Sequence, residues 1–138
     1  MSFDVSIVPC GSYDMGEVRA ALSAALAPLG GLDWVRPGMK IAVKVNLISA
    51  MRPDAAATVH PALLTALTEL LQERGASVVL GDSPGGLFTA AHLNRVYDVC
   101  GLRQCEQAGA ALNLDTAQTE AHAPEAVQAR TFTYTRWL

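Results

Sequence analysis

The chain has 138 residues, which is enough for one domain with a hydrophobic core of its own. Hydrophobic residues make up 51% of the sequence, but no apolar run approaches the roughly 20 residues of a membrane span, so we expect a soluble globular protein. The formal net charge is −3 and the Lys and Arg residues are scattered, which argues against a nucleic-acid partner.

The amino terminus and the cysteines indicate the compartment. The start, Met-Ser-Phe-Asp, has neither a positive leader nor an apolar segment with a cleavage site, which predicts a cytoplasmic location. The three cysteines, Cys10, Cys100 and Cys105, are odd in number and make no disulfide framework, as is typical of a reducing compartment. No second Cys or His pair accompanies them, so we predict no metal site and expect Cys100 and Cys105 to serve in packing.

The first two predicted elements are a strand and a helix. A short β-branched run at residues 4–8 is halted by Pro9, which predicts a strand that enters a turn. Ser12 or Asp14 is a candidate cap for the helix that follows, and the pair of glycines after residue 29 is its stop signal. Apolar residues recur at helical spacing in between, at Val18, Leu22, Ala25, Leu26 and Leu29.

Two apolar runs of strand length surround an amphipathic helix in the middle of the chain. The first run is residues 40–46, Lys-Ile-Ala-Val-Lys-Val-Asn, and the second is residues 77–80. Pro61 suits the first position of the helix between them, with His60 or Thr58 near its cap. The pattern predicts a β-α-β unit.

Signals weaken toward the carboxyl terminus. The sequence predicts a helix over residues 89–99, a short helical turn over 102–108 and a strand over 110–114. The polar, alanine-rich residues 115–129 predict a loop, whereas 131–138 alternate as a strand does.

This order of elements predicts an α/β fold over residues 1–138 as a single domain. Strand–helix–strand crossovers are nearly always right-handed and pack back on the same sheet, so we expect a three-layer domain with a mostly parallel sheet and helices on both faces. Because the chain stops inside an apparent strand, we expect it to be the amino-terminal fragment of a longer protein. Ligands of such sheets bind beyond the carboxyl ends of the strands.

Polar side chains gather where the two central strands end. Lys44 and Asn46 share one face of the first strand, and an unpaired buried ammonium is costly, so Lys44 needs an acid, an anionic ligand or a route to water. Asp82, at the matching end of the neighbouring strand, is the expected partner, and Ser83 follows it. If these four converge they can orient an anion or a carbonyl group. Alternatively, Lys44 simply reaches solvent and Asn46 caps the turn.

Two further candidates lie nearby. Gly85 follows Asp82 in a glycine-rich loop whose amides could approach a ligand, although the loop has no phosphate-binding motif and could be an ordinary turn held by Asp82. His60, beside Thr58, is either a helix cap or a ligand. The sequence shows no recognisable set of a nucleophile, a base and a third residue that orients the base, so it does not indicate a particular reaction.

Four short motifs occur along the chain: Lys44-Val45-Asn46-Leu47, Thr58-Val59-His60-Pro61, Gly75-Ala76 and Gly81-Asp82-Ser83-Pro84-Gly85. In order and spacing they resemble the amino-terminal half of the domain of unknown function 362 family, and the similarity covers nearly the whole chain. Members of that family often carry a downstream ferredoxin-type module that binds 4Fe–4S clusters. The cysteines of this chain do not fit the cluster motif, so the resemblance implies no cofactor here and a cluster only in a downstream part of the parent protein.

The sequence leaves three functional hypotheses open. In the first, the parent protein is iron-sulfur-associated and redox-linked, and this domain supplies a small-ligand or anion cleft and contacts the missing carboxy-terminal part of the same protein. In the second, the domain is a non-catalytic module that binds a small anionic metabolite or a partner protein. In the third, the polar strand ends are only structural.

Overall fold

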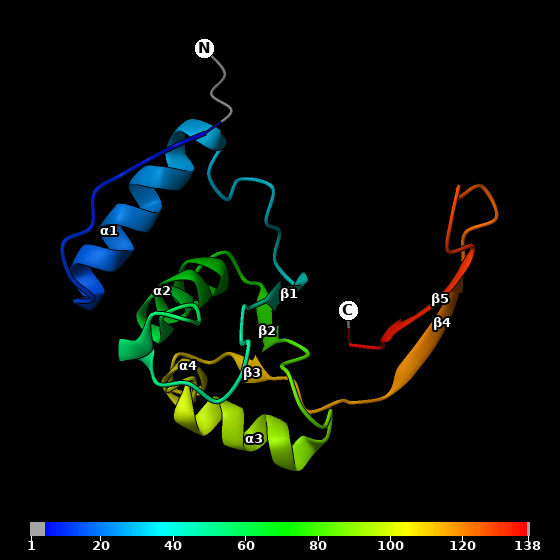
Figure 1. Ribbon diagram of the computed structural model, residues 1–138. Coiled ribbons are helices and arrows are strands. Elements are labelled where there is room, and N and C mark those ends of the chain that lie inside the picture. The colour runs from blue at the N-terminus through cyan, green and yellow to red at the C-terminus, as the bar shows by residue number, and fades with distance from the viewer. Residues whose placement is uncertain (1–4, 138) are drawn as a thin grey trace.

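The computed structural model describes residues 5–137 (Figure 1). Its main sheet has three parallel strands in the order β1-β2-β3, in which each strand pairs with the next along the chain. The strands are β1 (Lys40–Lys44), β2 (Ser77–Gly81) and β3 (Ala111–Leu112). The predicted α/β fold with a parallel sheet is therefore confirmed.

The helices begin where the sequence places their caps. The Asp14 carboxylate accepts hydrogen bonds from the first amides of α1, the His60 ring accepts one at α2, and the Thr89 hydroxyl accepts one at α3. The helices are α1 (Met15–Leu26), η1 (Ala27–Leu29), η2 (Pro53–Ala55), α2 (Pro61–Gln72), α3 (Ala90–Val99) and α4 (Arg103–Gln107).

One face of the sheet carries the core. Side chains of α2, α3 and α4 share a single buried cluster with Val78 and Leu80 of β2, and α1 packs on α2. Strands in sequential order joined by right-handed crossovers place their helices on the same side, which explains this arrangement. On β1 the opposite face, Lys40, Ala42 and Lys44, is exposed. The predicted three-layer arrangement is not confirmed within the described residues.

The carboxy-terminal part forms an antiparallel hairpin that projects from the body (Figure 1). Its strands are β4 (Gln118–His122) and β5 (Thr131–Thr135). The strand predicted over 131–138 is confirmed at 131–135, and residue 138 lies outside the described residues. The loop predicted over 115–129 is wrong at β4. The polar sequence of β4 does not indicate a strand, but its residues pair with Phe132 and Tyr134 of β5, and this pairing stabilises the extended conformation.

The amino-terminal segment does not form the strand predicted over residues 4–8. Residues 5–8 follow an irregular extended path beside α1, and Val5 and Ile7 are 70% and 90% exposed. Residue 4 lies outside the described residues. An extended β-branched segment becomes a strand only when its backbone is paired, and residues 5–8 have no strand partner in the described part of the chain.

Candidate functional site

Lys44 and Asp82 meet at the carboxyl edge of the sheet. Lys44 lies opposite Gly81 in the β1–β2 register, so Asp82 follows directly beside it. The Lys44 Nζ lies 2.7 Å from the Asp82 Oδ1. The side chain of Lys44 is 62% exposed, whereas that of Asp82 is 8% exposed. The carboxylate is thus fixed in the protein, and the ammonium group extends from it into solvent.

Asp82 also binds the turn that follows β1. Its Oδ2 accepts a hydrogen bond of 2.9 Å from the buried amide of Leu47. Burial opposes ionisation of this carboxyl group, but the hydrogen bonds from Leu47, Lys44 and the Ser83 amide outweigh it and hold the pKa of Asp82 below its ordinary value. Asp82 is therefore ionised at neutral pH and joins the two strand ends.

The other predicted residues at this edge differ in availability. Asn46 and Ser83 are exposed beside the ion pair, so their amide and hydroxyl groups are open to a ligand. The Gly85 amide instead donates a hydrogen bond of 2.8 Å to the Ile48 carbonyl and joins the two loops. The edge therefore presents one ammonium group and two neutral hydrogen-bonding side chains, a set that suits an anion or a carbonyl oxygen.

His60 lies in a different depression, of about 530 Å³. Its lining residues are Tyr13, Arg52, Pro53, Asp54, His60 and Val99 and include neither Lys44 nor Asp82. The His60 ring stacks on Tyr13 with the ring centroids 3.5 Å apart, and its Nδ1 accepts a hydrogen bond from the Ala62 amide. The predicted role of His60 as a helix cap is confirmed. Thr58 is buried, and its hydroxyl has no hydrogen-bond partner among the described residues.

The His60 cap should make stability depend on pH. Burial lowers the pKa of His60 below the ordinary 6.5, so the folded state favours the neutral ring, whose Nδ1 is the acceptor in the cap. This contribution is complete above pH 6.5 and is lost as the pH falls through that value toward the folded-state pKa. We expect the free energy of unfolding, measured with urea, to fall between pH 7 and pH 5.

His60→Asn is the matched control, because Asn caps helices well and does not titrate in this range. We expect the variant to match the wild type at pH 7 and to lack its loss of stability between pH 7 and pH 5. Identical pH profiles for the two proteins would contradict this account of His60.

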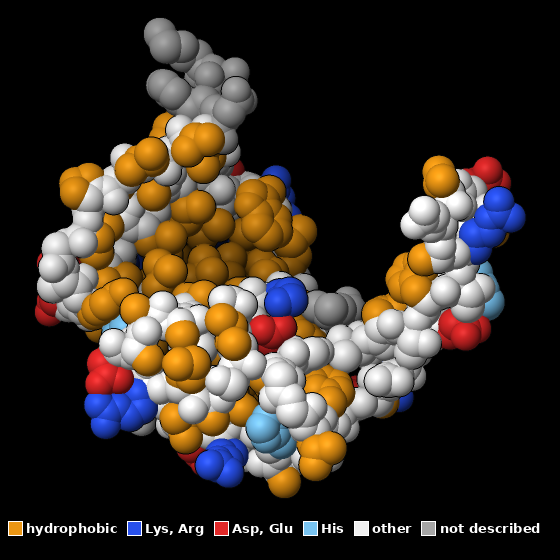
Figure 2. Space-filling view, viewed as in Figure 1, with side chains coloured by type: hydrophobic (Ala, Val, Ile, Leu, Met, Phe, Trp, Pro, Cys, Tyr) orange, Lys and Arg blue, Asp and Glu red, His pale blue; other side chains and the backbone are white. Residues whose placement is uncertain are grey.

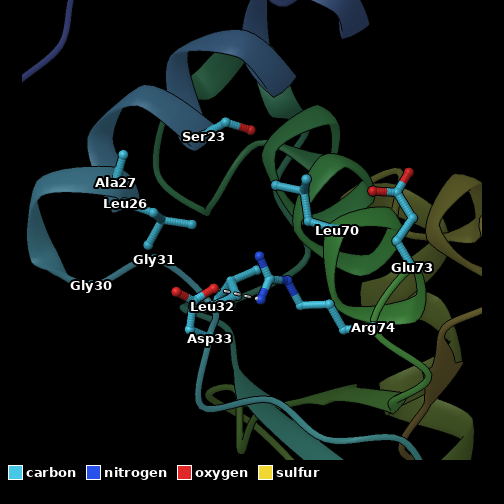
Figure 3. Close-up of a pocket in the computed structure, with 10 residues that line it drawn as sticks. All are labelled: Ser23, Leu26, Ala27, Gly30, Gly31, Leu32, Asp33, Leu70, Glu73 and Arg74. Atoms are coloured by element: carbon cyan, nitrogen blue, oxygen red, sulfur yellow. Dashed lines mark hydrogen bonds and ion pairs between the residues drawn. The ribbon is translucent and has the colours of Figure 1, made fainter.

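A separate pocket lies at the opposite end of α2, near the amino edge of the sheet (Figure 3). It has a volume of about 390 Å³. Leu26 of the α1 end and Leu70 of α2 lie on opposite sides of it, and an ion pair of 3.0 Å between Arg74 and Asp33 closes one side. None of the residues predicted from the sequence as ligand-binding lines this pocket.

Comparison with known proteins identifies the family of this chain. The family described as "Domain of unknown function (DUF362)" matches residues 41–136, which include β2, all of β1 except Lys40, and the ion pair between Lys44 and Asp82. The chain belongs to the DUF362 family. The resemblance inferred from the four sequence motifs is thereby confirmed.

One curated relative of this DUF362 domain is the thylakoid-associated protein sll1697 of Synechocystis sp. (strain ATCC 27184 / PCC 6803 / Kazusa). The two are 37% identical over 81 residues, which are 58% of this chain and 25% of the relative. The chain thus matches about a quarter of that protein's length. No solved structure matches this chain. Within residues 5–137, none of the helices has both the length and the apolar character that crossing a bilayer requires.

The three cysteines of the chain differ in exposure. Cys10 is exposed, whereas Cys100 and Cys105 are buried in the core, as their predicted packing role requires. Burial raises the pKa of the Cys105 thiol, which disfavours the thiolate that a metal would bind. Among residues 5–137, no three His, Cys, Asp or Glu side chains lie together as metal ligands.

The sequence assigned no structural role to two residues that organise the surroundings of Asp82 and His60. Leu47 supplies the amide that orients Asp82, and its side chain is fully buried. Tyr13 covers His60. The apolar character of Leu47 directly after a strand was the available signal for the first, whereas the stacking partner of His60 depends on tertiary packing.

Proposed function

We propose that this domain binds a small anionic ligand at the carboxyl edge of its sheet. Lys44 supplies the positive charge, Asn46 and Ser83 donate hydrogen bonds, and Asp82 positions the ammonium group. The observation that carries the proposal is the asymmetry of the ion pair, in which a buried carboxylate holds an ammonium group that is 62% exposed. Two of its three N–H donors remain for a ligand.

An anion-binding assay tests this role of Lys44. With orthophosphate as the probe at ten times its dissociation constant, binding should stabilise the wild type by about 1.4 kcal/mol and raise its Tm by about 4 °C. Lys44→Met should abolish this shift because it removes the only charge that the proposal assigns to the ligand. Differential scanning fluorimetry and isothermal titration calorimetry measure the two quantities.

Lys40→Met is the matched control. Lys40 and Lys44 lie on the same exposed face of β1, but Lys40 lies at the amino end of the strand, far from Asp82. We expect the Lys40 variant to keep the full response to phosphate. An equal loss of the phosphate response in both variants would show that this response depends only on the net charge of the protein. An unchanged response in Lys44→Met would refute the proposed site.

We further propose that the domain acts within a longer, redox-linked and iron-sulfur-associated protein. The support is the downstream ferredoxin-type module that the family resemblance implies, together with the match to only a quarter of the relative's length. Any 4Fe–4S cluster would be held outside this chain, because the described cysteines do not fit one. Iron and sulfide analysis of the parent protein, purified without oxygen, tests this arrangement.

A second candidate function is a non-catalytic module that binds a partner protein. The face of the sheet opposite the helices favours it, because Ala42 and Ala111 are exposed there, although the Trp137 ring lies against this face at Gly81. Phe132 and Tyr134 of the hairpin, which are 46% and 39% exposed, favour it as well. The carboxy-terminal part of the same protein is the partner we favour, and its packing on this face would complete a three-layer fold. Hydrogen exchange of β1 and β5 in the parent protein, compared with this chain, distinguishes this candidate.

A further inference from the structure

We propose that residues 5–8 can insert as a fourth parallel strand along the free edge of β1, beneath α1. In the structure these residues form no strand, although Val5 and Ile7 are β-branched and alternate with Ser6 and Val8. Their exposures of 70% and 90% leave two large apolar side chains in water. Insertion would bury one of the two faces of this segment and pair its backbone.

The edge of β1 offers the required partner. β1 pairs only with β2 among the described strands, so the backbone groups on its other side have no strand partner. Ile41 and Val43 face the helical side and pack against the core cluster, yet they remain only partly buried. An unpaired edge next to half-covered apolar side chains favours the addition of a strand.

A hollow of matching character lies beside this edge. Figure 2 shows hydrophobic side chains gathered in a hollow between α1 and the rest of the body. At the amino edge of the sheet, Leu26 and Leu70 line the pocket of about 390 Å³. The segment Val-Ser-Ile-Val at residues 5–8 carries no charge and is therefore suited to an apolar hollow.

The direction of α1 fixes the direction of the inserted strand. Tyr13, just before α1, stacks on His60 at the start of α2, and further along Arg19 pairs with Glu69. The two helices therefore run parallel and begin near the same edge of the sheet. A strand that leads into α1 must end at that edge and run parallel to β1, and the crossover through α1 would then match the crossover through α2.

The connection between the segment and α1 has a suitable length. Residues 9–14 are six residues, within the usual range for a strand-to-helix connection. Insertion would bring Cys10, Gly11 and Ser12 to the carboxyl edge, where the loops after β1 and β2 carry Asn46 and Ser83. The new strand would thus add a third loop to the edge at which ligands of parallel sheets bind.

Hydrogen exchange of residues 5–8 tests the insertion in the 138-residue protein. If the segment pairs with β1, its amides should exchange at least about 100-fold more slowly than those of an unstructured peptide. Ile7→Asp should abolish that protection and lower the Tm by roughly 10 °C, because a carboxylate would enter an apolar seat. Exchange of these amides at the rate of an unstructured peptide would overturn the proposal.

Two control variants and the molecular mass complete the test. Ile7→Val preserves a β-branched apolar side chain and should keep the protection. Val127→Asp places the same charge on a side chain that is 95% exposed and should leave the Tm unchanged. Equal Tm shifts in Ile7→Asp and Val127→Asp would overturn the proposal. The proposal would also be overturned if the protection of residues 5–8 depended on protein concentration and light scattering gave the mass of a dimer. Such a result would indicate that two copies of the chain exchange strands.

Discussion

Asp82→Ala should lower the free energy of unfolding by about 3 kcal/mol. The substitution leaves the buried Leu47 amide without its acceptor, and it removes the acceptor of the Ser83 amide and the partner of Lys44. The buried amide accounts for most of the loss, because the exposed ammonium group of Lys44 regains water. Urea unfolding at pH 7 measures this difference.

Asp82→Asn separates the hydrogen bond from the charge. The Asn side chain keeps an oxygen that can accept from Leu47, so we expect a loss smaller than that of Asp82→Ala by about 1 kcal/mol or more. Asp54→Ala, which removes an exposed carboxylate paired with Arg52, is the control and should leave the unfolding midpoint unchanged. A midpoint for Asp82→Ala equal to that of Asp54→Ala would refute the anchoring role.

The low pKa of Asp82 gives this prediction a pH dependence. Because the folded state lowers the pKa, the contribution of the carboxylate is complete above the unfolded-state value and is lost as the pH falls through the folded-state pKa. The stability difference between the wild type and Asp82→Asn should therefore be constant near neutral pH and shrink in acid below about pH 4. A difference that grows on acidification would contradict this sign.

The fold could be predicted where apolar periodicity was strong. The strands that begin at Lys40 and Ser77, and the helix that begins at Pro61, follow from continuous apolar runs with clear caps and turns. The strand at 118–122 could not be predicted, because its stability comes from pairing with β5 rather than from its own side chains. The distribution of helices over the two faces of the sheet could not be predicted in the same way, since it depends on strand order, which periodicity does not encode.

The candidate site was predictable in part for a similar reason. Parallel strands that are neighbours end at the same edge, so the approach of Lys44 and Asp82 followed from their positions in two adjacent strands. The separation of His60 from this pair did not follow, because the connection at residues 45–60 leaves the start of α2 undetermined. The contact between Asp82 and the Leu47 amide depends on a turn whose geometry the sequence does not specify.

Leu47→Ala should lower the free energy of unfolding by about 3 kcal/mol. The Leu47 side chain is 0% exposed and belongs to the main core cluster, so truncation leaves a cavity that the packed surroundings can fill only in part. Its neighbour Ile48 is 53% exposed in the same turn, and Ile48→Ala should cost less than about 1 kcal/mol. Urea unfolding of both variants compares the two positions directly.

The same pair of variants tests how the core supports the site. The Leu47 side chain fixes the turn, its amide orients Asp82, and Asp82 holds the ammonium group of Lys44. Leu47→Ala should therefore weaken the binding of orthophosphate at a temperature where the variant is still folded, although Leu47 itself is buried away from any ligand. Ile48→Ala should bind like the wild type. Full binding by folded Leu47→Ala would show that Asp82 keeps its position without the buried side chain.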